Sequence, residues 1–193
     1  MDDKDLPPFM LAERDALLAE IYEVFAEVDR QRGISWGEAN SIDDYGSPGI
    51  SAAERGWDRD RKWQDLPDDT NWDPENGWHW SFLDAIGFRY YLPAAMVFVM
   101  RKGRDTDFIF QLTAIKGDYL DYREAQWALL NLPQRLCIKH FMQYMGIVTA
   151  YRQAESDPRG WFASIPYWEK TGDETEGETP PSSPRRPKRK KMR

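Results

Sequence analysis

Two charged residues stand inside an otherwise apolar stretch of the sequence, where they could take part in chemistry. Asp84 and Arg89 lie on either side of Gly87, and the apolar surroundings predict that both side chains are partly buried. A buried charge needs a partner, and a bidentate aspartate–arginine pair is the simplest one. We therefore expect Arg89 to bond Asp84, Asp65 or a backbone carbonyl. Such a bond would tie the polar segment 56–77 to the core.

The same region also admits a functional interpretation. In that alternative, a pocket is lined by Trp63, Arg89, Tyr90 and Tyr91. A pair of carboxylates near Arg89 in such a pocket would be capable of general acid–base catalysis. An enzyme of unrecognised type is thus one alternative function. Most aspartates nevertheless lie in segment 56–77, where a solvated loop is the simpler interpretation.

Neither metal binding nor nucleophilic catalysis has a recognisable motif. The chain has two histidines, His79 and His140, and one cysteine, Cys137, with none of the spacings typical of zinc or calcium sites. His140 and Cys137 fall on the apolar face of a predicted helix and are expected to pack in the core. His79 lies between two tryptophans and is a candidate surface or pocket residue. We expect no cofactor.

Charge is most concentrated at the C-terminus. Residues 169–193 hold eight Lys or Arg against five Asp or Glu, whereas residues 1–168 hold 18 against 28. The composition of residues 169–193 predicts disorder, because it offers little apolar surface to bury. A basic end can neutralise the phosphates of a nucleic acid or of a membrane surface; a solvated, solubilising end is the alternative. The candidate nucleic-acid contacts are Arg185, Arg186, Lys188, Arg189, Lys190, Lys191 and Arg193.

Tryptophans recur along the polar segment 56–77. Trp57, Trp63 and Trp72 interrupt a run rich in aspartate, in which we expect a long loop with little regular structure. Such a loop must be held to the body, and buried rings would hold it. An indole can also stack on a base, a sugar or a peptide side chain, so ligand binding is the alternative.

Hydrophobic periodicity predicts helices on both sides of the sequence centre. Apolar residues recur at three- and four-residue steps from Leu11 to Val28, which indicates an amphipathic first helix. A further helix is expected over residues 122–130. A long helix is expected to begin at Pro133, with an apolar stripe that continues to Tyr151.

The middle of the sequence is its most apolar part. Residues 94–102 are apolar on all sides up to Arg101, which is typical of a buried helix, and Pro93 suits its first turn. The short apolar runs 88–92 and 108–112 are compatible with a minor two-strand element.

These patterns predict a mainly α fold. We expect a single-domain irregular helical bundle of five or six helices over residues 10–168, preceded by a flexible segment 1–9 and followed by the tail 169–193. Nine Trp, nine Tyr and nine Phe predict an aromatic core. The single cysteine, the acidic start and the absence of a long apolar run predict a soluble, cytoplasmic protein with no membrane span.

A resemblance to a family rests on the stretch SFLDAIGFRYYLPA, residues 81–94. This stretch resembles the core signature of an uncharacterised bacterial family, domain of unknown function 6714. Similar flanking pieces are the first helix and residues 38–46, 63–67, 132–141 and 167–168. The resemblance spans about residues 10–168; the basic tail and the longer tryptophan-rich loop depart from it. It implies a small bacterial cytosolic protein, and no activity or catalytic residue.

The expected function is a non-catalytic one. An acidic body with exposed aromatic residues suits a protein partner, so the chain is interpreted as a protein-interaction or accessory, immunity-like module. A nucleic-acid-associated protein that binds through the basic tail is the first alternative, and the enzyme described above is the second. The sequence does not constrain the oligomeric state.

Overall fold

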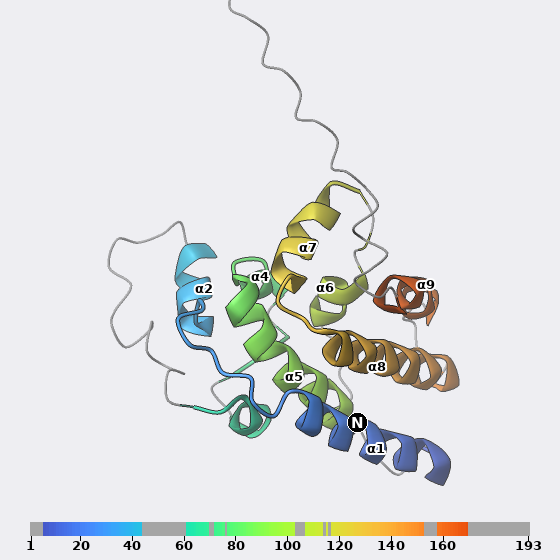
Figure 1. Ribbon diagram of the computed structural model, residues 1–193. Coiled ribbons are helices and arrows are strands. Elements are labelled where there is room, and N and C mark those ends of the chain that lie inside the picture. Colours follow the sequence, from blue (N-terminus) through green and yellow to red (C-terminus); the bar gives the residue numbers. More distant parts are fainter. Residues whose placement is uncertain are drawn as a thin grey trace, which may run out of the picture.

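The computed structural model describes residues 6–43, 61–69, 72–75, 77–102, 107–113, 115, 117–152 and 158–169. Within them every regular element is helical, as Figure 1 shows. The α-helices are α1 (Pro8–Val24), α2 (Trp36–Asp43), α4 (Gly77–Trp80), α5 (Ala85–Lys102), α6 (Phe110–Thr113), α7 (Leu120–Trp127), α8 (Leu132–Tyr151) and α9 (Pro158–Glu169). Three 3-10 helices are η2 (Trp63–Asp68), η3 (Asp107–Ile109) and η4 (Gly117–Tyr119). The mainly α fold class predicted from the sequence is confirmed.

Helix α5 crosses the middle of the molecule, with α2 and α4 beside its beginning and α1 and α8 beside its end (Figure 1). It packs against η2, α7 and α1. Its side chains are buried almost continuously from Tyr90 to Met100, which explains why this sequence has no polar face. Pro93 lies inside α5 and not in its first turn, so the predicted start at Pro93 is wrong. The helix begins at Ala85, where Asp84 caps it.

The predicted two-strand element is wrong. Residues 88–92 belong to α5, and residues 108–112 form most of η3 and α6; the described ranges contain no strand. Both runs are short and apolar, and burial on every side produces such a run in a helix as readily as in a strand. The spacing of apolar residues in these two runs therefore cannot distinguish a helix from a strand.

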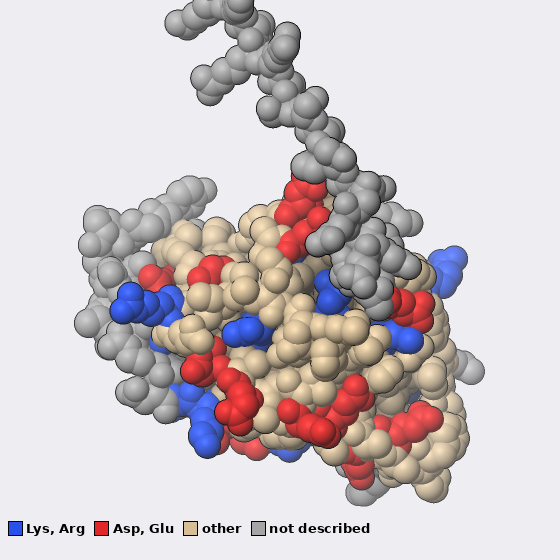
Figure 2. Space-filling view, viewed as in Figure 1, with Lys and Arg blue, Asp and Glu red and all other residues tan. Residues whose placement is uncertain are grey.

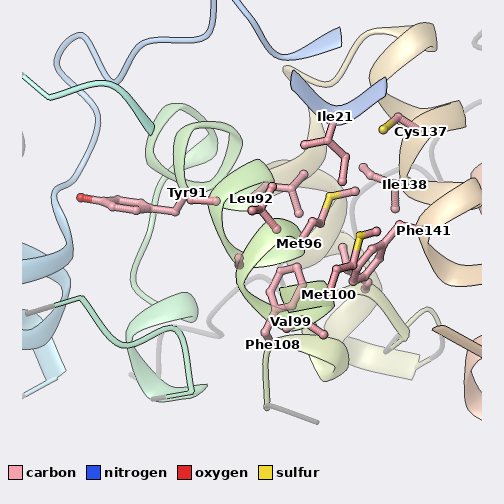
Figure 3. Close-up of a cluster of buried hydrophobic side chains, with 14 of the residues drawn as sticks. Ile21, Tyr91, Leu92, Met96, Val99, Met100, Phe108, Cys137, Ile138 and Phe141 are labelled. Carbon is pink, nitrogen blue, oxygen red and sulfur yellow. The ribbon is translucent and has the colours of Figure 1, made fainter. Parts of the chain in front are cut away.

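The hydrophobic core lies where α1, α5 and α8 meet. Figure 3 shows Ile21 of α1, Met96 of α5 and Phe141 of α8 pointing toward one another. All three side chains are fully buried. Tyr91 points the opposite way in Figure 3, toward a second buried region that is rich in tryptophan. Helix α5 thus supplies side chains to two sides of the core.

The buried stripe of helix α8 is displaced from the one that the sequence predicted, because it includes Ile138 and Met142 and leaves Ile147 exposed. Asn131 caps it through the backbone N–H of Gln134, and Cys137 and Phe141 are buried. His140 is exposed instead, and its Nδ1 donates to Glu20 Oε1 of α1 at 2.9 Å. The prediction of a packed core histidine is wrong, because at 3.6 residues per turn His140 lies at one edge of the apolar stripe.

The helices described here are too short or too polar to cross a lipid bilayer.

Candidate functional site

The carboxylate of Asp84 holds two backbone segments together. Its Oδ1 accepts from Gly87 N at 2.8 Å, which caps α5, and from Ile34 N at 3.0 Å, which fixes the segment before α2. Glycine is required on both sides of this contact. A Cβ on Gly87 would lie 2.5 Å from Ile34 O, and a Cβ on Gly33 would lie 2.6 Å from Gly87 N. Asp84 and Gly87 are therefore structural residues of the signature stretch.

Replacing Asp84 with alanine is expected to lower the free energy of unfolding by about 1–3 kcal/mol, because α5 loses its cap and Ile34 N–H loses its acceptor. Asp84→Asn retains an acceptor oxygen and is expected to recover most of that loss. Urea unfolding followed by far-UV circular dichroism measures both variants. An equal loss in the two variants would contradict the hydrogen-bonding role and indicate that the negative charge itself is needed.

Arg89 does not pair with either aspartate considered in the sequence analysis. Its Nη1 donates to Leu129 O at 3.3 Å, so its partner is a backbone carbonyl, the third alternative considered. That carbonyl belongs to the turn between α7 and α8 and not to segment 56–77. Asp65 is exposed, on η2. The structure therefore does not bring Asp65, Asp84 and Arg89 together as one charged group.

The aromatic residues proposed to line a pocket are buried in the core. The Trp63 indole donates to Phe25 O at 2.8 Å, and the Tyr90 hydroxyl donates to Arg61 O at 3.0 Å. The Tyr91 hydroxyl accepts from Trp36 N at 2.7 Å. All three rings are fully buried, so they anchor neighbouring segments to α5.

His79 belongs to the second buried region. Its ring meets Trp36 edge-on, with 5.0 Å between the centroids, and its Nε2 hydrogen-bonds with Asn40 Oδ1 at 2.7 Å. Trp72 and Trp80 contact the same Trp36 ring. His79 is thus placed among packed rings, and in the part of the chain that the structure describes no three His, Cys, Asp or Glu side chains gather as a metal site.

Three exposed aromatic residues come from the consecutive elements α6, η4 and α7. Phe110 of α6 is 52% exposed, Tyr119 of η4 is 64% exposed and Tyr122 of α7 is 42% exposed. Arg123 lies between two of these rings, with its Cζ 5.8 Å from the centroid of Phe110 and 5.5 Å from that of Tyr122. We call Phe110, Tyr119, Tyr122 and Arg123 the α6–α7 aromatic surface.

Arg123 is buried although it lies beneath exposed rings. Its side chain is 2% exposed, and its Nη1 donates to Gln126 Oε1 at 2.7 Å. The amide of Gln126 in turn donates to the carbonyls of Trp80 at 2.8 Å and Leu83 at 2.9 Å. The Tyr122 hydroxyl donates to Ser81 O. These bonds fix α7 against the chain between α4 and α5.

The electrostatics of this surface follow from partial burial. Burial lowers the pKa of Arg123, and the neighbouring Tyr122 partly offsets that effect. Burial raises the pKa of Tyr122, and Arg123 opposes the rise. The guanidinium remains charged at neutral pH, because the ordinary pKa of arginine lies so far above it. Burial and Glu124, the residue after Arg123 in α7, raise the pKa of Tyr167 to about 12, and the Tyr167 hydroxyl donates to Glu124 Oε1 at 3.2 Å.

This surface was not predicted from the sequence. The available signal was two tyrosines three residues apart, Tyr119 and Tyr122, with an arginine next to the second in an otherwise polar helix. At that spacing both rings lie on one face of a helix or its preceding turn. The seven basic residues of the tail, from Arg185 to Arg193, and Trp57 lie outside the described residues.

Comparison with known proteins gives one result. The model of a family described as a family of unknown function (DUF6714) matches residues 13–172. The resemblance based on the stretch 81–94 is thereby confirmed. No curated protein and no solved structure matches the chain.

Proposed function

The chain belongs to this family of unknown function, DUF6714, and from that premise we propose that it is a non-catalytic protein-interaction module whose contact region is the α6–α7 aromatic surface. Its role is that of an accessory or immunity-like protein in the bacterial cytoplasm, where it acts by holding one protein partner. The observation that carries this proposal is the exposure of three large rings from consecutive elements, two of which lie over one buried arginine.

Protein interfaces favour this composition. Aromatic side chains and arginine are enriched at interfaces, and tyrosine and arginine are among the residues that contribute most to binding. Phe110, Tyr119 and Tyr122 leave roughly half of each ring in water, which is unfavourable for an isolated protein. A partner that covers the rings would remove this apolar area from water.

A tagged pull-down from the native host, with nuclease treatment and mass spectrometry, tests the proposal. The wild-type chain is expected to retain one protein partner at a stoichiometric level. The double variant Phe110→Ser/Tyr119→Ser is expected to lose it, because two exposed rings of the contact region are removed. Phe9→Ser is the matched control: Phe9 is 61% exposed on α1, and its replacement is expected to change nothing.

The opposite outcomes decide between the functions. Retention of the partner by the double variant would contradict the proposal that the α6–α7 aromatic surface is the contact region. Recovery of nucleic acid, or loss of all recovered proteins on nuclease treatment, would favour the second candidate, binding through the basic tail. That candidate is supported by seven Lys or Arg among the last ten residues. An empty pull-down would leave the enzyme alternative.

A further inference from the structure

Arg123 is a buried cation, and the part of the chain that the structure describes gives it no anionic partner. Among the described residues no carboxylate lies within ion-pair distance of its guanidinium. Its Nη1 bonds the neutral amide of Gln126, and its Nε is buried with no acceptor. Protein interiors seldom leave a buried charged donor in this state. The group is therefore equipped to accept a ligand that carries both a negative charge and an oxygen acceptor.

A purely structural role explains only part of this geometry. Orienting the amide of Gln126 toward the carbonyls of Trp80 and Leu83 needs one donor, and Nη1 supplies it. That role does not require the Nε–H, nor does it require a delocalised cation between two rings. The faces of Phe110 and Tyr122 do stabilise the cation. They cannot accept the in-plane hydrogen bonds that a guanidinium makes.

Arg123 belongs to the α6–α7 aromatic surface, which is already proposed as the contact region. Phe110 and Tyr122 are the exposed rings that cover the guanidinium, and exposed side chains change rotamer within nanoseconds. Rotation of the Phe110 ring would uncover the edge of Arg123. A ligand group that enters there would lie between two apolar faces, in surroundings that strengthen an ion pair relative to water.

The charge of the surroundings favours a singly charged ligand. Asp121 and Glu124 flank Arg123 on α7, and both are exposed. Figure 2 shows acidic side chains on the upper part of the viewed face, where α7 lies in Figure 1. A doubly charged phosphate would be repelled more strongly by this field than a single carboxylate. A carboxylate also matches the two parallel donors that one edge of a guanidinium offers.

Resting on the proposed interaction surface, we propose that Arg123 is its recognition residue: the protein partner inserts an aspartate or glutamate side chain between Phe110 and Tyr122, and its carboxylate binds the guanidinium. The partner is thus a protein with an acidic residue that stands out from an apolar patch. The rings of the surface contact that patch, and the carboxylate fixes its position.

The test uses the full chain and a stated probe. The probe is the peptide acetyl-Ala-Leu-Glu-Leu-Ala-amide, and its glutamine analogue is the control. The Nε–Hε signal of Arg123 in a nitrogen–proton NMR spectrum is expected to shift saturably with the glutamate peptide and to stay in place with the glutamine peptide. The Nε of Arg89 is also buried without an acceptor but lies outside the surface, so its signal is the internal reference.

A second test of the peptide site uses a variant that keeps the arginine. Phe110→Ala keeps Arg123 and its bond to Gln126 but removes one covering ring, and it is expected to weaken peptide binding by about fivefold. Its circular dichroism spectrum checks that the fold is retained. A structural role of Arg123 alone would leave peptide binding undetectable in both proteins.

Three NMR results would overturn the inference. The first is the absence of a saturable shift, or equal shifts with both peptides. The second is a larger shift with inorganic phosphate than with the glutamate peptide, which would make the ligand a phosphate. The third is a shift of the Arg123 signal on deleting residues 170–193, which would make the acidic part of the chain's own tail the occupant. If Arg123→Lys retains the host partner, this inference fails and the proposed function stands. If Phe110→Ser/Tyr119→Ser retains it, the proposed function fails.

Discussion

With Trp63 replaced by alanine, the free energy of unfolding is expected to fall by about 3–5 kcal/mol. The indole is fully buried, stacks on Tyr22 with 5.1 Å between the ring centroids, and donates to Phe25 O at 2.8 Å. Truncation therefore removes packing and leaves a cavity, and it also leaves the Phe25 carbonyl without its donor. Since α5 packs against η2, the loss would loosen the whole contact.

Two further variants separate these contributions in the same denaturant titration. Trp63→Phe keeps most of the packing but removes the indole N–H, and is expected to cost about 1–3 kcal/mol. Phe9→Ala removes an exposed ring and is expected to change the stability by less than about 0.5 kcal/mol. A loss below about 1 kcal/mol for Trp63→Ala would contradict the anchoring role and restore the alternative of a ring held for a ligand.

Gly87→Ala is expected to destabilise the protein by about 1–3 kcal/mol, although alanine is the better helix former. The added Cβ would lie 2.5 Å from Ile34 O and 3.0 Å from Asp84 Oδ1. The first neighbour is backbone and cannot rotate away, so the segment before α2 must move off α5.

Gly160 provides the matched comparison. It also lies in an α-helix, α9, but a Cβ there would meet nothing within 4 Å. Gly160→Ala is therefore expected to stabilise the protein, by up to about 1 kcal/mol. The two substitutions are chemically identical, and thermal unfolding should give shifts of opposite sign. A shift of the same sign in both variants would contradict the close approach at Gly87.

The sequence predicted those elements whose two faces differ. Helix α1 and the long helix α8 have a polar side and an apolar side, and their periodicity predicted both, although α1 ends at Val24 and not near Val28. Helix α5 has no polar side, so its start was predicted at Pro93 and not at Ala85. The position of His140 failed for a related reason, because a broad apolar stripe does not define where its edge lies.

The candidate site depended on contacts that no sequence pattern encodes. The aspartate and arginine of the signature stretch were expected to have polar partners, and they do, but Asp84 binds Ile34 N, which is 50 residues away. From the sequence alone, Arg123 would be expected to be a solvated residue of a polar helix. Only the folded chain shows that Phe110, from a separate element, covers its guanidinium.

The contacts of Trp63 with Phe25 and of Asp84 with Ile34 have a consequence for how the chain can change in length. Each of them joins a residue before segment 44–60 to a residue after it. The entropy lost on closing a chain segment grows only with the logarithm of its length, so doubling it costs roughly 0.6 kcal/mol. Insertions and deletions between residues 44 and 60 should therefore accumulate during evolution while the fold on either side is preserved.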